Sequence, residues 1–256
     1  MAPEDISAAE AARTAPPESI TALLASTSEE VLCALIENPS LDETHVCLLL
    51  ERKDLSGSLL EEISKRKTWR ASYRIRRALA AHPHTPRLIA IRLLRDLHLM
   101  DLVRISLLPA STGELRRLAE ERVLAQLPQM PLGQRLTLAK RGSSRIAAGL
   151  IAQGPEQAAR AALDNVFLSE SHLLKTLADE ELPARVVVAV ATHRKWSKLV
   201  NIRVAILRHP NAPAECVAAF VAELPRREIE EILGDSRISE AVRIHLRHEI
   251  ARREKG

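Results

Sequence analysis

Aromatic side chains are scarce in this sequence, which has two Trp, one Tyr and two Phe among 256 residues. Glycine is scarce too, with eight residues, and β-branched residues rarely alternate with polar ones over the length of a strand. Hairpins and β-sandwiches need those features, so the sequence disfavours them. The apolar residues make up 46% of the chain and are mostly Leu, Ala, Ile and Val, spaced three and four apart. The sequence therefore predicts an all-α fold.

Cysteines and long apolar runs are also few. Cys33, Cys47 and Cys216 lack CxxC or CxxxC spacing, which argues against a zinc site or a disulfide framework and favours core thiols in a reducing compartment. No apolar run approaches the ~20 residues that cross a bilayer. The N-terminus is acidic and lacks the apolar stretch of a signal peptide. We expect a soluble cytoplasmic protein that contacts no membrane and holds no cofactor.

Catalytic motifs are missing as well. The sequence contains no GxSxG, HExxH, GxxxxGK(S/T) or GxGxxG. His245 and His248 stand three apart on one predicted helix, but no third ligand is near in sequence, so we predict no metal site. These absences favour a binding protein over an enzyme, although catalytic groups can be assembled by a fold without a motif.

The chain contains an internal duplication at an offset of 127 residues. Residues 29–127 align with 156–254 without a gap and share 18 identities in 99 positions. The identities gather where predicted helices meet. Asn38, Leu41, Glu43 and His45 recur as Asn165, Leu168, Glu170 and His172, and Trp69, Ile75, Arg76, Ala78, His82, Pro83 and Pro86 recur as Trp196, Ile202, Arg203, Ala205, His209, Pro210 and Pro213.

The recurring prolines predict the same turn in both copies. Pro83 and Pro210 cannot continue a helix, and they move the preceding histidine away from helical geometry. Pro86 and Pro213 fit the first turn of the next helix, where the missing N–H costs nothing. Each joint is therefore a tight helix-turn-helix.

The helices between these joints are too short to bury an apolar face alone, so they need neighbouring pairs, as in an α-solenoid. We expect an acidic N-terminal arm over residues 1–28 that is frayed or contains a short helix. A first block over 29–127, a connecting helical pair over 128–155 and a second block over 156–256 follow. Because no flexible linker separates the copies, we expect one continuous superhelix.

The pattern IRxA(L/I)xxHPx(T/A)P, at residues 75–86 and 202–213, resembles the leucine-rich repeat variant and related HEAT-like repeats of bacterial proteins. The resemblance implies a HEAT/armadillo-like superhelix of about eight helical pairs that binds macromolecules. Some relatives carry an iron-sulfur cluster on N-terminal cysteines, which this sequence lacks.

Positive charge is concentrated in two matching zones. The net charge is +4, but residues 1–54 hold eleven acids and three bases, whereas residues 63–95 hold ten bases and no acid. Residues 182–214 and 122–155 are also free of acids. A surface for an anionic partner and a solvated set of helix faces are both open interpretations. The candidate binding residues are Lys67, Arg70, Arg74, Arg76, Arg77, Arg194, Lys195, Lys198, Arg203 and Arg208.

Two kinds of recurring residue suggest structural roles. Arg76 and Arg203 stand beside the apolar stripe, where they can pair with a neighbouring helix. Trp69 and Trp196 follow basic runs at a turn, where an indole fills the gap between helical pairs and its N–H finds a partner. For all four residues we favour a structural role over contact with a ligand.

Two functions remain open. The first is a non-enzymatic scaffold whose surface binds a protein partner. The alternative is a basic nucleic-acid-binding HEAT-like protein, with DNA repair as one form of it, although the shortage of aromatic stacking platforms counts against that reading.

Overall fold

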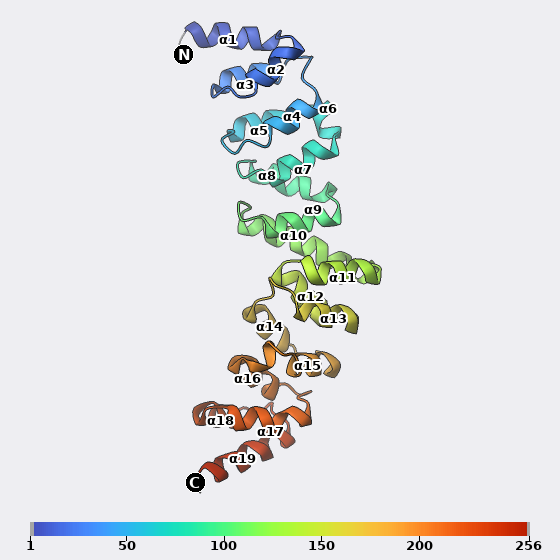
Figure 1. Ribbon diagram of the computed structural model, residues 1–256, viewed down its shortest axis with the longest axis vertical. Helices are drawn as coiled ribbons and strands as arrows, with labels where there is room; N and C mark the ends of the chain where they lie inside the picture. The colour runs from blue at the N-terminus through green and yellow to red at the C-terminus, as the bar shows by residue number, and fades with distance from the viewer. Residues whose placement is uncertain (1–2, 255–256) are drawn as a thin grey trace. The chain divides into compact units, whose positions relative to one another are not determined.

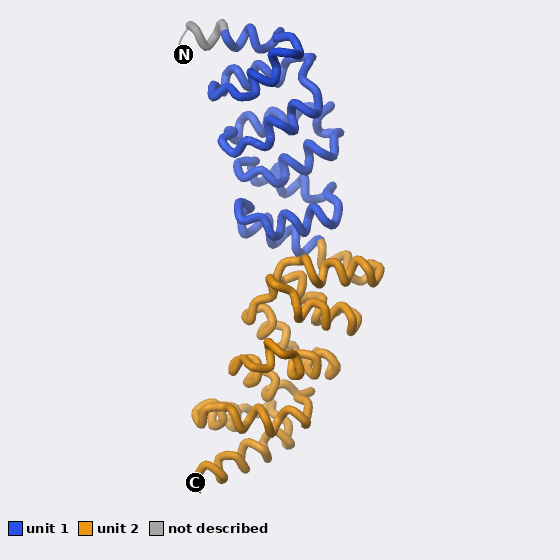
Figure 2. The backbone as a smooth tube through the Cα atoms, viewed as in Figure 1, with its two compact units in different colours: residues 1–122 blue, residues 123–256 orange. Residues whose placement is uncertain are grey.

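A computed structural model describes residues 3–254 of the chain, with side chains from residue 8 onward, and this part is all-helical without a strand. Residues 1–122 and 123–256 form two compact units, and the boundary falls inside helix α10 (Gly113–Gln126; Figure 2). None of the described helices is both long enough and apolar enough to cross a bilayer. The predicted all-α class is confirmed.

Short helices stack one on the next within each unit (Figure 1). The first unit contains α1 (Pro3–Arg13), α2 (Pro17–Leu23), α3 (Glu29–Leu35), α4 (Glu43–Leu49), α5 (Gly57–Lys65), α6 (Lys67–Ala71), α7 (Tyr73–Ala81), α8 (Arg87–Leu93), the 3-10 helix η1 (Leu94–Asp96), α9 (Leu99–Leu107) and most of α10 (Gly113–Gln126). The second contains η2 (Leu127–Gln129), α11 (Leu132–Arg141), α12 (Ser144–Gln153), α13 (Glu156–Leu163), α14 (Glu170–Leu177), α15 (Ala184–Ala191), η3 (Trp196–Lys198), α16 (Val200–Arg208), α17 (Ala214–Glu223), α18 (Arg226–Leu233) and α19 (Glu240–Glu254).

The two units correspond helix by helix at the offset of 127. The 3-10 helix η3 stands at the place of α6, and every other α-helix of the first unit has an α-helical counterpart. Residues 128–155, expected as a connecting pair, form α11 and α12, which match α1 and α2. The repeated structure therefore begins earlier in each copy than the sequence identities indicate.

Buried asparagines fix the same turn in both units. The Asn38 side-chain amide donates to the carbonyl oxygens of Ala12 and Ala15, at 2.9 Å each. Asn165 donates to the carbonyls 127 residues further on, those of Ala139 at 2.7 Å and Gly142 at 3.0 Å. These bonds satisfy carbonyls at the ends of the first helix of each unit, and they explain why an asparagine stands at both places.

The His-Pro joints match in the same way. Nε2 of His82 donates to the Arg52 carbonyl at 2.6 Å, and Nε2 of His209 donates to the Asp179 carbonyl at 3.0 Å. In both rings Nδ1 accepts a backbone N–H two residues later, an arrangement that fits the neutral tautomer with its proton on Nε2. Burial lowers the pKa of His82, which favours this neutral form.

Each unit buries its core between two layers of helices. In the first unit α3 packs on α1 and α5, while α7 packs on α4 and α9. In the second, α13 packs on α11 and α15, while α14 packs on α12 and α16. Within residues 3–28, where a frayed arm or a short helix is expected, the structure has the two helices α1 and α2, and Ala12 and Ile20 are fully buried.

Candidate functional site

The candidate basic residues of the first unit lie on two faces. Arg74 and Arg77, on α7, line a groove of about 270 Å³ together with Arg104 of α9. Arg70 and Arg76 line a different and larger cavity. Lys67 is exposed on α6 and lines neither. The basic zone of residues 63–95 is therefore divided between two faces of the unit, because neighbouring positions along α7 point to different sides of the helix.

Most candidate bases of the second unit have partners within that unit. Arg203 bonds Glu223 at 2.6 Å, Arg208 bonds Glu231 at 2.7 Å, and Arg194 lies 3.9 Å from Asp164. Lys195 places its Nζ 3.9 Å from the centre of the Trp196 ring. Lys198 is exposed and pairs with none of the described side chains. This unit therefore presents less uncompensated positive charge than the sequence zone indicates.

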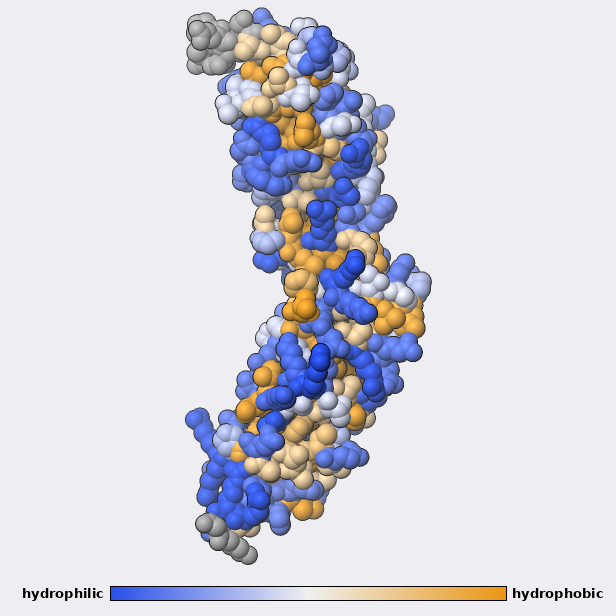
Figure 3. All heavy atoms as spheres, viewed as in Figure 1, coloured by the Kyte–Doolittle hydropathy of each residue, from blue (hydrophilic) through white to orange (hydrophobic). Residues whose placement is uncertain are grey.

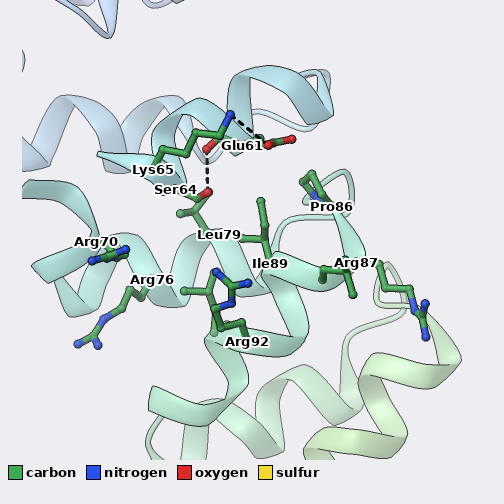
Figure 4. Close-up of a pocket in the computed structure, with 12 residues that line it drawn as sticks. Glu61, Ser64, Lys65, Arg70, Arg76, Leu79, Pro86, Arg87, Ile89 and Arg92 are labelled. Carbon is green, nitrogen blue, oxygen red and sulfur yellow. Dashed lines mark hydrogen bonds and ion pairs between the residues drawn. The ribbon is translucent and has the colours of Figure 1, made fainter. Parts of the chain in front are cut away.

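The larger cavity, which we name the α5–α8 cleft, holds about 550 Å³ and lies between α5, α6, α7 and α8 (Figure 4). Its wall is apolar and its edge is basic. The wall consists of Leu79, Pro86, Leu88, Ile89 and Leu93, the basic residues are Lys65, Arg70, Arg76, Arg87 and Arg92, and Glu61 and Ser64 complete it. Leu88 is 72% exposed, which is unusual for a leucine and leaves apolar surface for a ligand.

Two of the five bases form hydrogen-bonded ion pairs with carboxylates. Lys65 bonds Glu62 at 2.8 Å and Glu61 at 3.1 Å, and these bonds raise the pKa of the ammonium group. Arg87 turns away from the cavity in Figure 4 and its Nη2 donates to Glu114 at 2.6 Å. That bond raises the pKa of Arg87 and lowers the pKa of Glu114.

The remaining three arginines are less compensated. Arg76 places Nη1 3.7 Å from Asp96, beyond hydrogen-bond distance. Arg70 and Arg92 are exposed and form no ion pair or side-chain hydrogen bond with the described residues. Figure 4 shows Arg70 and Arg76 at one end of the cavity and Arg92 on the α8 side, near Ile89. The positive charge of the cleft that has no hydrogen-bonded carboxylate is therefore concentrated in these three side chains, of which only Arg76 lies near a described acid, Asp96.

The matching place in the second unit has lost this chemistry. Ser197, Ala214 and Ala219 stand where the first unit has Arg70, Arg87 and Arg92, and Glu215 stands in place of Leu88. Arg203 matches Arg76, but its guanidinium packs 5.6 Å over the Phe220 ring and its side chain is only 12% exposed. The duplicated fold thus carries one basic cleft with an exposed leucine, in the first unit.

Arg203 has a hydrogen bond that Arg76 lacks. Nε of Arg203 donates to the Ser197 carbonyl at 2.6 Å. Nε of Arg76 is buried and has no acceptor among the described residues. A buried donor without an acceptor carries a free-energy penalty that a bound acceptor removes.

The two tryptophans are buried. Trp196 is 1% exposed and its Nε1 donates to the Leu163 carbonyl at 2.8 Å, whereas Trp69 is 7% exposed beneath the guanidinium of Arg66. Both positions agree with the expected filling of a gap between helical pairs.

Sequence reasoning found Arg70 and Arg76 but missed the rest of the cleft. Leu88 and Ile89 look like ordinary apolar helix positions, and only the local accessibility of Leu88 distinguishes it. The substitution of Leu88 by Glu215 in the aligned copy is a signal that could have marked it. Figure 3 shows hydrophilic and apolar residues mixed on the visible face of each unit, so exposure alone would not have marked Leu88 as part of a site.

Comparison with known proteins adds no assignment. No family model, no curated protein and no solved structure matches the chain. Within the part of the chain that the structure describes, no three His, Cys, Asp or Glu side chains are grouped so as to hold a metal ion.

Proposed function

We propose that this chain is a cytoplasmic, non-enzymatic interaction scaffold, an α-solenoid of the HEAT-like or leucine-rich repeat variant type, and that its α5–α8 cleft binds an acidic segment of a protein partner. The observation that carries the proposal is the combination of an apolar wall with uncompensated arginines in one cavity. A segment with leucine-like side chains beside carboxylates complements both features.

The distribution of charge favours a protein partner over nucleic acid. A nucleic-acid surface needs bases that follow a phosphate backbone, whereas the bases of the first unit divide between two faces and several of those in the second unit pair with carboxylates. The exposed wall around Leu88 also has no counterpart in a sugar-phosphate chain. Arginine is enriched among the residues that contribute most to protein–protein binding.

A random-peptide library selected on the full chain tests this function. The enriched peptides should combine Asp or Glu with Leu, Ile or Phe, and their affinity should fall with added salt. The variant Arg70→Ser/Leu88→Glu/Arg92→Ala carries the residues of the second unit at these positions, and it removes only exposed side chains. It should weaken binding by about tenfold or more, roughly 1.4 kcal/mol.

Arg95→Ala is the matched control. Arg95 is an exposed arginine of the same basic zone that lies outside the cleft, and alanine stands at the aligned position 222. Peptides without acidic enrichment, or equal losses in the control and the cleft variant, would contradict the proposal. Tight duplex or single-strand binding with a steep salt dependence and no peptide selection would support the nucleic-acid alternative instead.

A further inference from the structure

The α5–α8 cleft contains an unused hydrogen-bond donor at a defined place. Nε of Arg76 is buried without an acceptor, while Nε of the matching Arg203 has one in the Ser197 carbonyl. At this point of the chain the first unit has the helix α6 where the second unit has η3. An acceptor supplied by a ligand would take the place of the missing carbonyl.

Two further guanidinium groups line the same cavity. Arg70 and Arg92 contribute uncompensated charge and up to five N–H donors each. Of the three positions, the second unit keeps an arginine only at Arg203, whose Nε has a hydrogen-bond acceptor. Ser197 and Ala219 stand at the positions of Arg70 and Arg92. The first unit therefore brings three guanidinium groups without a hydrogen-bonded carboxylate to one cleft. The buried Nε of Arg208 in the second unit also lacks a hydrogen-bond acceptor within the described part of the chain, but Arg208 is held by Glu231 at 2.7 Å.

This donor set exceeds what a carboxylate needs. A carboxylate offers two oxygens and one negative charge, and a single arginine satisfies it in a bidentate pair. A phosphate monoester offers three oxygens and a charge of about −1.5 to −2, and clusters of arginine recognise it in proteins. Three arginines around one cavity, with only Asp96 close to one of them, fit the larger anion better.

We infer that the cleft recognises a phosphorylated serine or threonine of the partner protein, with Arg70, Arg76 and Arg92 on the phosphate and Leu88 against an adjacent apolar residue. This inference rests on the proposed binding of a protein segment and adds that phosphorylation of that segment controls the affinity. Binding is noncovalent, and the cleft is a reader of the modification.

Oriented peptide libraries test this inference. Three arrays share degenerate flanking positions and differ only in the fixed central residue, which is phosphoserine, serine or glutamate. Binding of the labelled full-length chain should be about tenfold stronger to the phosphoserine array than to the glutamate array, and weaker still to the serine array. Leucine-like residues should be enriched beside the phosphoserine because Leu88 remains available to them.

Variants connect the preference to the three side chains. Arg70→Ser/Arg92→Ala should abolish the preference for phosphoserine over glutamate. Arg76→Lys keeps the charge but removes Nε, and should reduce the preference severalfold. Arg95→Ala should leave it unchanged, and thermal melting of each variant shows that the fold is intact.

The two proposals fail differently. Equal binding of the phosphoserine and glutamate arrays, with acidic and leucine enrichment still present in the flanks, overturns the phosphate inference alone. A phosphoserine preference that survives Arg70→Ser/Arg92→Ala also overturns it, because the phosphate then binds elsewhere. An absence of selectivity at the centre and in the flanks overturns both the inference and the proposed function.

Discussion

Replacing Trp196 by alanine should destabilise the second unit by about 5 kcal/mol. Burial of a tryptophan contributes on the order of 3–5 kcal/mol in a well-packed site, and Trp196 is 1% exposed. The substitution also leaves the Leu163 carbonyl without the 2.8 Å bond from the indole, which adds on the order of 1 kcal/mol. Trp196→Phe keeps part of the packing and loses the hydrogen bond, so its smaller cost separates the two contributions.

The chain provides its own reporter for this measurement. Each unit has one tryptophan, so in Trp196→Ala the only remaining indole is Trp69 of the first unit. In a urea titration, circular dichroism should show the second unit unfolding at lower denaturant, while Trp69 fluorescence keeps its midpoint. Pro213→Ala is the control at the next joint and should cost less than about 1 kcal/mol, because the proline only pre-sets a first-turn angle.

An unchanged unfolding curve would refute this reasoning. If Trp196→Ala kept its stability and lost its peptide ligand, the indole would be a recognition residue. If Trp69 fluorescence shifted together with circular dichroism, the stabilisation by Trp196 would not be confined to its own unit.

Two other predictions concern the turn and the acid range. Asn165→Ala removes the amide that satisfies the Ala139 and Gly142 carbonyls in a buried turn, and it should cost about 2–4 kcal/mol in the same urea titration. Hydrogen bonds from Arg237 hold the pKa of Asp235 at about 2, below its usual 3.8. Above about pH 4 the free energy of unfolding of the wild type should therefore exceed that of Asp235→Asn by on the order of 1 kcal/mol. That difference should vanish as the pH falls toward about 2, and a difference that grows on acidification would show that the carboxylate is not stabilising.

The helical elements and joints could be predicted from sequence because their causes are local. A proline ends or begins a helix by its own geometry, so the joints at Pro83 and Pro210 follow from the residue type. The hydrogen bonds of His82 and His209 could not be predicted, because their acceptors lie 30 residues earlier in the chain. The sequence identities also do not show that the repeat extends to α1 and α11. Asn38 and Asn165 bond to backbone carbonyls at the ends of these helices, and a backbone carbonyl requires no particular residue type.

The cleft was predictable only in part. Arg70 and Arg76 stand out by charge and recurrence, but spacing alone does not reveal that Arg74, two residues before Arg76, lines a different groove. Nor does composition distinguish Arg203, which is held by Glu223 and Ser197, from Arg76, whose Nε lacks an acceptor. Pairing depends on neighbours that the fold supplies, so the candidate list mixed structural arginines with available ones.

The hydrogen bonds that join helical pairs have a consequence for how the chain is made. Those of the asparagine, histidine and Trp196 side chains connect residues 23 to 33 positions apart, about one helical pair with its joint. A fold of such low contact order closes short loops and forms fast. During synthesis each pair can dock on the one before it as soon as it leaves the ribosome, so the first unit can complete its cleft before the second is translated.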